Sequence, residues 1–174
     1  MECFDEYDFE RKPTGQVLDD RSDMPKGGYH LIAHLCIFNS AGEMLIQKRQ
    51  SFKGKWPNMW DLSVGGKIQA GESSQEGIQR ELKEELNLEI DFSGLRPRLT
   101  LNHENGYDDI FIVEKAVNLD ELILQEDEVK AVKWASKETI LKMIENAEFI
   151  NYYTNLIPLL FEMRKNYGYI YDDF

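Results

Sequence analysis

The segment 73–86 constrains the chain most, because it has the pattern of an amphipathic helix with three glutamates grouped along one side. A helix advances by about 100° per residue, so Glu81, Glu84 and Glu85 fall within about a third of a turn. Apolar residues recur at a spacing of four on the neighbouring face: Ile78, Leu82 and Leu86. Ser73 or Ser74 can cap the start of this helix. We therefore expect one buried face with a carboxylate cluster beside it.

A carboxylate cluster on one helix needs an explanation, because like charges at this spacing repel each other. A divalent cation reverses that effect, since Mg²⁺ prefers hard oxygen ligands and bridges carboxylates to substrate phosphates. Such an ion can polarise a phosphoryl oxygen, activate water and neutralise a leaving group. Gly65 and Gly66 precede the helix and let the backbone approach a metal ion or a phosphate closely. The alternative is a solvated acidic surface, which the pattern Glu-x-x-Glu-Glu alone would favour.

The size and charge of the chain limit its class. Its 174 residues fit one domain with a single core, and its formal net charge of -12 disfavours nucleic acid as a partner. No apolar stretch suggests a membrane span or a signal peptide, so we expect a cytoplasmic location. Cys3 and Cys36 cannot form a disulfide framework, and we expect Cys36 to be a buried, reduced thiol.

The order of strand and helix patterns predicts an α/β protein with a mixed β-sheet between helices. Residues 1–27 form a polar N-terminal extension with at most one short strand, near Val17 and Leu18. A hairpin over 29–38 and 43–48 is followed by a strand over 60–64 that the two glycines stop. The later strands are expected over 99–103, 110–117 and 129–134.

The last third of the chain, 136–166, is expected to hold C-terminal helices. Ser136 caps one that runs to about residue 146, and the other covers about residues 151–166. The second helix should pack on the core through apolar residues at helical spacing: Leu156, Leu159, Leu160 and Met163. The aromatic, acidic tail at 167–174 has no assigned function.

The pattern around the glutamate helix resembles the Nudix box. The matching residues are Gly66, Glu72, Arg80, Glu81, Leu82, Glu84, Glu85 and Leu88. Asn87 stands where the box has its last glycine, and asparagine is the next best residue for a left-handed helix end. The resemblance implies a single Nudix hydrolase domain over 1–174, with the box at 66–88 and the fold of an α/β/α sandwich.

This resemblance implies a hydrolase that cleaves the diphosphate bond of a nucleoside diphosphate linked to another moiety, with Mg²⁺ or Mn²⁺ as cofactor. The catalytic positions it assigns are Glu81, Glu84, Glu85 and Arg80. The three glutamates would bind the metal, Glu81 as a ligand or a base, and the carbonyl of Gly65 would complete the site. Arg80 and Glu72 would orient the cluster through a charge-assisted contact. A homodimer is compatible with the resemblance.

Further residues are candidates for base and substrate contacts. Members of the family commonly use an acidic residue outside the box, and the candidates are Glu104, Asp108, Asp109, Glu126, Asp127 and Glu128. We interpret most of these as solvated loop charges. The candidates for substrate binding are Lys67, Arg49, Trp56 and Tyr107, since aromatic rings stack on bases and basic side chains attract phosphates. Surface lysines and an aromatic residue covering a loop are the alternative.

A second resemblance is to isopentenyl-diphosphate isomerases, through residues 30–39, 47–49, 60 and 63–64. Those enzymes carry a catalytic cysteine where this chain has Gly65 and a metal-binding histidine where it has Lys67. His30 matches another of their metal ligands, whereas Asp23 takes the place of a further histidine. We favour hydrolysis over isomerase chemistry, and over a non-catalytic nucleotide-binding module because the box glutamates are all present. His30 and His34, on one side of a strand, are expected to be hydrogen-bonded rather than metal ligands.

Overall fold

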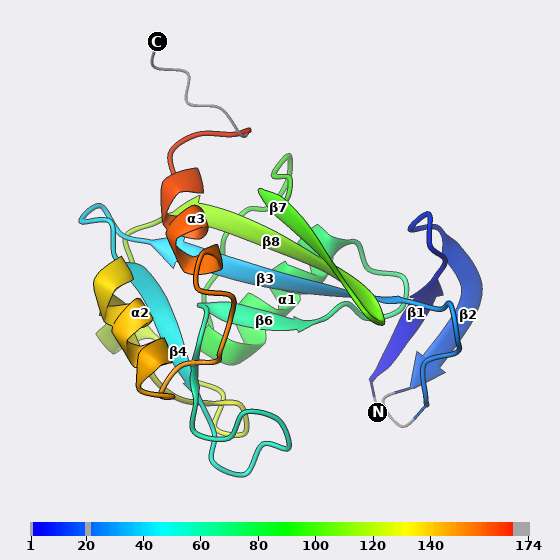
Figure 1. Cartoon of the computed structure of the whole chain (residues 1–174), viewed down its shortest axis with the longest axis horizontal. Helices are drawn as coiled ribbons and strands as arrows, with labels where there is room; N and C mark the ends of the chain where they lie inside the picture. Colours follow the sequence, from blue (N-terminus) through cyan, green and yellow to red (C-terminus); the bar gives the residue numbers. More distant parts are fainter. Residues whose placement is uncertain (1, 20–21, 169–174) are drawn as a thin grey trace.

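The computed structural model describes residues 2–19 and 22–168, so most of the tail at 167–174 lies outside the described residues. A mixed seven-stranded sheet forms the centre (Figure 1). Strand β3 (His30–Phe38) pairs in parallel with β8 (Gly106–Glu114) and antiparallel with β6 (Val64–Lys67). Strand β7 (Leu99–His103) extends the sheet beyond β8. In the described part of the chain, no helix is long and apolar enough to cross a membrane.

The sheet divides where β3 and β4 (Met44–Arg49) separate. These strands pair only at Phe38 and Met44, so the predicted hairpin is limited to its turn. Beyond that point β4 pairs with β5 (Trp60–Asp61) and with β9 (Val129–Ala135). Ser63 is fully buried in the fork: its hydroxyl accepts a hydrogen bond from the Ile37 amide at 2.8 Å and donates to the Leu45 carbonyl at 2.5 Å. Where β3 and β4 diverge, β6 lies between the two halves of the sheet.

Helices cover both faces of the sheet, which confirms the α/β/α sandwich. Helix α1 (Ser74–Leu86) packs on one face, with Ala33 and Leu35 in its core cluster. Helices α2 (Lys137–Glu145) and α3 (Leu156–Met163) pack on the other face, where Phe38 points. Two apolar cores therefore lie on either side of one sheet. Cys36 is buried in the second core as a free thiol, and burial raises its pKa, as expected for an unreactive cysteine.

Helix α1 forms as its local signals predict. Ser73 is the N-cap and makes a capping box with Glu76. Asn87 ends the helix in the left-handed conformation, with φ 52°. The predicted apolar stripe is fully buried: Ile78, Leu82 and Leu86. These contacts fix both the position of the helix and the direction of its glutamates.

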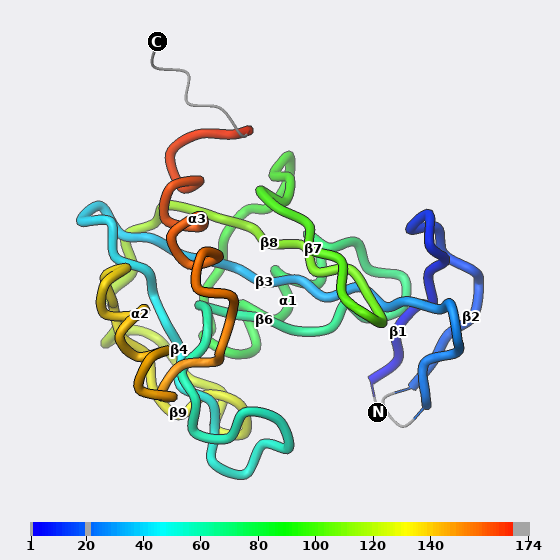
Figure 2. The backbone as a smooth tube through the Cα atoms, viewed as in Figure 1, coloured from blue at the N-terminus to red at the C-terminus, as the bar shows by residue number. Residues whose placement is uncertain are grey.

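The prediction of at most one short strand in residues 1–27 is wrong. Strands β1 (Cys3–Tyr7) and β2 (Pro13–Asp19) form an antiparallel hairpin at the end of the molecule opposite α2 (Figure 2). The hairpin supports the loop before α1: the Ala70 amide donates to the Cys3 carbonyl and the Gly71 amide to Asp5 Oδ2, both at 2.8 Å. Long-range contacts that a local polar pattern does not reveal stabilise these strands.

Three predicted boundaries need correction. The strand predicted over 60–64 is divided between β5 and β6, and β6 continues through both glycines to Lys67 because its backbone pairs with residues 32–35 of β3. Strand β8 begins at Gly106, earlier than predicted, since its acidic residues have partners inside the fold. Helix α3 is shorter than predicted, and it buries Ile157 and Leu160 while leaving Leu159 40% exposed.

Candidate active site

The two glycines of β6 determine how closely the elements around the site approach. A Cβ added at Gly66 would lie well within 3 Å of the Glu81 carboxylate, so this carboxylate packs directly on the backbone of the strand. A Cβ at Gly65 would meet the ring of His34 equally closely, on the other face of the sheet. A side chain at either position would displace Glu81 or His34, so glycine allows both groups to lie against the strand.

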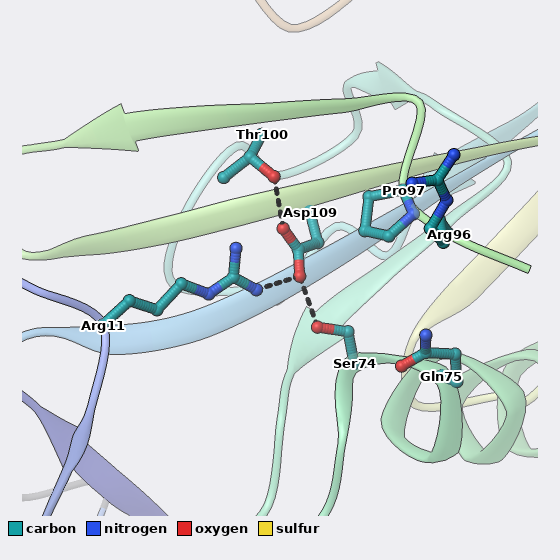
Figure 3. Close-up of a pocket in the computed structure, with 7 residues that line it drawn as sticks. All are labelled: Arg11, Ser74, Gln75, Arg96, Pro97, Thr100 and Asp109. Atoms are coloured by element: carbon teal, nitrogen blue, oxygen red, sulfur yellow. Dashed lines mark hydrogen bonds and ion pairs between the residues drawn. The ribbon is translucent and has the colours of Figure 1, made fainter. Parts of the chain in front are cut away.

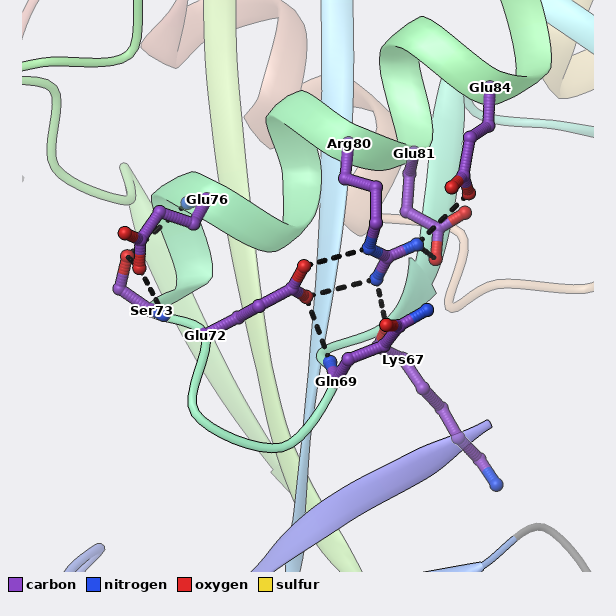
Figure 4. Close-up of polar contacts among 8 residues, drawn as sticks. All are labelled: Lys67, Gln69, Glu72, Ser73, Glu76, Arg80, Glu81 and Glu84. Atoms are coloured by element: carbon purple, nitrogen blue, oxygen red, sulfur yellow. Dashed lines mark hydrogen bonds and ion pairs between the residues drawn. The ribbon is translucent and has the colours of Figure 1, made fainter. Parts of the chain in front are cut away.

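Arg80 joins the carboxylates on the side of α1 that faces the end of β6 and the loop after it (Figure 4). Its Nε donates to Glu72 Oε1 at 2.8 Å and its Nη2 to Glu72 Oε2 at 3.1 Å, a bidentate pair. Its Nη1 donates to Glu81 Oε1 at 2.9 Å and to Glu84 Oε2 at 3.1 Å, while Nη2 also reaches the Lys67 carbonyl at 3.1 Å. Although burial opposes it, the hydrogen bond from Arg80 lowers the pKa of Glu72. Arg80 thus ties the loop before the helix to the glutamate cluster.

The glutamates differ strongly in exposure. The Glu84 side chain is 46% exposed, whereas that of Glu81 is 14% exposed. Burial raises the pKa of Glu81 to about 7, with Arg80 opposing the shift. Glu81 therefore combines a buried carboxylate with a single cationic partner.

Glu85 is the most deeply buried of the three and is 4% exposed. Burial raises its pKa well above the usual range, and the nearby charge of Glu81 adds to the shift. Its Oε2 accepts a hydrogen bond from Gln47 Nε2 at 3.1 Å. Sequence reasoning gave Gln47 no role in the site, since a lone glutamine in an apolar strand carries no local signal. A buried anion with one neutral donor is costly unless a cation neutralises it.

The carboxylate oxygens in this region suit a divalent cation, although those of Glu81 and Glu84 accept hydrogen bonds from Arg80. No group of three or more acidic, histidine or cysteine side chains in the described residues is arranged to hold a metal ion. The reason is visible in the contacts, because Arg80 Nη1 lies between Glu81 and Glu84. The side chains offer hard carboxylate oxygens, and the exposed Glu84 has room to rotate. The chemistry of the donor set therefore fits Mg²⁺ or Mn²⁺.

Two of the acidic candidates outside the box have structural partners. Asp108 and Asp109 lie in β8 and not in a loop, whereas the other four candidates lie in turns, in agreement with the interpretation of most of the six as loop charges. Asp109 is 1% exposed and contacts Arg11, Ser74 and Thr100, in a cavity of about 330 Å³ at the start of α1 (Figure 3). Asp108 pairs with His34 Nδ1 at 2.8 Å.

The remaining acidic groups include two near Glu85. The charges of Glu128 and of Asp61, which the sequence did not single out, both raise the pKa of Glu85. The Glu128 carboxylate pairs with Lys53, while Asp61 accepts a hydrogen bond from the Tyr152 hydroxyl at 2.7 Å. Glu126 and Asp127 belong to the same loop, and Glu104 to the turn between β7 and β8.

The histidines take part in packing and hydrogen bonding. His34 is hydrogen-bonded, as expected, and Asp108 raises its pKa although burial opposes the shift. His30 packs between Phe4 and His103, and burial lowers its pKa to about 4. No described histidine is part of a metal-binding group.

The substrate candidates do not form one surface. Tyr107 is 8% exposed and its hydroxyl donates to the Asp8 carbonyl at 2.7 Å, so its ring is not free to stack on a base. Trp56 is 51% exposed. Lys67 Nζ lies 4.5 Å from the centre of the Phe4 ring, and Arg49 Nη1 lies 3.9 Å from Asp61 Oδ2. Trp56, Arg49 and Lys67 retain exposed or charged groups that a ligand can contact.

A sandwich that packs a glutamate helix on a glycine-containing strand is the arrangement expected of the Nudix box. The NUDIX domain model matches residues 28–155, and the chain belongs to the Nudix hydrolase family. A Nudix hydrolase of Listeria monocytogenes is 40% identical over 153 residues, which cover 88% of this chain and 90% of that protein. A crystal structure from Deinococcus radiodurans has a TM-score of 0.72 at 25% identity and covers 94% of this chain and 100% of that chain.

The comparisons also include an isomerase. The isopentenyl-diphosphate Delta-isomerase of Escherichia coli is 31% identical over 138 residues, which cover 76% of each chain. The place where the resemblance puts the catalytic cysteine of such enzymes is Gly65 here, and the ring of His34 fills the space beside it. A thiol side chain at this position would require His34 to move.

Proposed function

We propose that the protein hydrolyses the diphosphate bond of a nucleoside diphosphate linked to another moiety, and that it depends on Mg²⁺ or Mn²⁺. Nudix hydrolases generally use divalent metals and cleave diphosphate bonds. The observation that carries the proposal is the pair of carboxylates on the helix that bears the box, with Glu85 buried and Glu81 largely withdrawn from solvent at 14% exposed. Burying two like charges side by side is costly, and a dication that binds both offsets the cost.

Glu81, Glu84 and Glu85 would hold the cation, with the carbonyl of Gly65 as a further oxygen ligand. A bound dication supplies charge neutralisation at the diphosphate oxygens and at the leaving group. If Glu81 does not bind the cation directly, its raised pKa, about 7, suits it instead to accept a proton from the attacking water. The bidentate pair of Glu72 with Arg80 keeps the loop and the helix in register.

The substrate contacts are proposed for two partly exposed basic residues and one exposed aromatic residue. Lys67 and Arg49 provide positive charge for phosphate oxygens, and Trp56 provides a ring on which a base can stack. Tyr107 is left out of this set because its ring and hydroxyl are used inside the fold. The acidic chain, at -12, makes small phosphate compounds with a dication better ligands than a nucleic acid.

The test is a screen of nucleoside diphosphate derivatives with Mg²⁺ and Mn²⁺, followed by product analysis. Glu84→Gln and Glu85→Gln should each lower kcat/KM at least about 100-fold, since losing a metal ligand removes several kcal/mol of transition-state stabilisation. Glu89→Gln is the matched control, because Glu89 lies just beyond the helix and, among the described residues, pairs with Lys83 alone. Full activity of both ligand variants would refute the proposed site. Formation of the allylic isomer from isopentenyl diphosphate would instead support the isomerase alternative, and nucleotide binding without turnover a binding module.

A further inference from the structure

We propose that Gln47 is a positioning residue of the cation site, which holds the carboxylate of Glu85 in place for a divalent cation; this rests on the proposed metal dependence. Gln47 lies on β4 outside the box, and β5 and β9 pair with it on both sides, opposite Asp61 and Val132. Its side chain is 3% exposed and points to the glutamates of α1. The backbone at Gln47 is therefore held more firmly than any loop residue near the site could be.

The contact between Gln47 and Glu85 is specific. Within the described residues, the hydrogen bond from Gln47 Nε2 at 3.1 Å is the one that the Glu85 carboxylate receives. It leaves Glu85 Oε1 free of hydrogen bonds and fixes the plane of the carboxylate. Groups that orient metal ligands in this way tune both ligand geometry and affinity.

The oxygen of the Gln47 amide, Oε1, indicates that Gln47 serves cation binding and not packing. Gln47 Oε1 is buried and has no hydrogen-bond partner among the described residues. An unsatisfied buried acceptor destabilises a fold, so an apolar side chain of the same length would suit packing better. A hydrated divalent cation beside Glu85 brings the hydrogen-bond donors that this oxygen lacks. The amide thus lowers the stability of the cation-free protein and favours the cation-bound one.

The test compares Gln47→Met with Gln75→Met, a matched control on α1 whose Nε2 donates to the Leu95 carbonyl at 2.9 Å. Binding of Mn²⁺ is measured by electron paramagnetic resonance, and the melting temperature is measured in EDTA. Gln47→Met should weaken Mn²⁺ binding about 10- to 100-fold and alter the spectrum of the bound ion. Its melting temperature in EDTA should be equal to or above that of the unmodified protein. Gln75→Met should leave the Mn²⁺ affinity unchanged.

The outcomes separate this inference from the proposed function. If Glu85→Gln abolishes Mn²⁺ binding while Gln47→Met binds Mn²⁺ as the unmodified protein does, the role of Gln47 is refuted and the metal site stands. A lower melting temperature of Gln47→Met in EDTA, with a proportionate loss of Mn²⁺ binding, assigns the residue to packing and also refutes the inference. If the unmodified protein binds no Mn²⁺, or Glu85→Gln binds it normally, both proposals fail.

Discussion

Replacing Glu81 by glutamine should make the cation-free protein more stable at neutral and alkaline pH. The Glu81 carboxyl is 14% exposed, and burial raises its pKa from 4.5 to about 7. Between these values the folded state binds more protons than the unfolded state, so the free energy of unfolding falls as pH rises. Each pKa unit corresponds to about 1.4 kcal/mol, so the loss is complete above pH 7 and amounts to about 3 kcal/mol. Glutamine at this position keeps the shape and removes the titration.

Urea unfolding in EDTA at pH 4.5 and pH 8 measures this effect. The unmodified protein should lose about 3 kcal/mol between the two pH values through Glu81, with a further loss through Glu85, whose pKa is also raised. Between the two pH values, Glu81→Gln should lose markedly less of its free energy of unfolding. It should be more stable than the unmodified protein at pH 8 but not at pH 4.5. Adding Mg²⁺ at pH 8 should stabilise the unmodified protein but not the variant. If the free energy of unfolding depended equally on pH in both proteins, the Glu81 carboxylate would not destabilise the folded state.

Two further substitutions test contacts that position the site. Gly66→Ala introduces a methyl group where the Glu81 carboxylate lies; it should cost about 1–3 kcal/mol and weaken Mn²⁺ binding. Gly54→Ala, with open space around it, is the control, and equal behaviour of the two variants would contradict this reading of the contact. Asp109→Ala removes the buried acceptor of Ser74 and Thr100 and the partner of the partly exposed Arg11, and it should destabilise the fold by about 1–3 kcal/mol. Because Asp109 is buried among its donors, activity per folded molecule at low temperature should be unchanged; its selective loss would make Asp109 a catalytic base.

The helix that carries the box was predictable because its signals are local. The cap at Ser73, the apolar stripe and the end at Asn87 all lie within the helix or beside it, and each is present in the structure. The α/β/α sandwich and the family were predictable for the same reason, since the box places one helix against one strand. The order of the predicted strands and helices supplied the rest of the fold.

The hairpin at the N-terminus and the start of β8 were not predictable from local patterns. Both contain acidic residues that a linear reading assigns to solvent, yet Asp5 accepts a hydrogen bond from the Gly71 amide and Asp108 pairs with His34. Each partner is distant in sequence, so these contacts become apparent only in three dimensions. The same holds for Gln47, whose partner Glu85 lies on another element.

The spacing of the box residues reflects the contacts that these residues make with one another in the folded protein. Gly66 is glycine because the Glu81 carboxylate lies against it, and Glu72 stands where Arg80 can bind it with two nitrogens. A pattern of this kind is specific because each residue satisfies a contact with another residue of the same pattern. A contact between a box residue and a residue outside the box, such as that of Glu85 with Gln47, produces no such sequence pattern. If Gln47 proves necessary for cation binding, the functional unit of this protein comprises the box and strand β4. Strand β4 would then hold the Glu85 carboxylate, for which helix α1 alone supplies no hydrogen-bond donor.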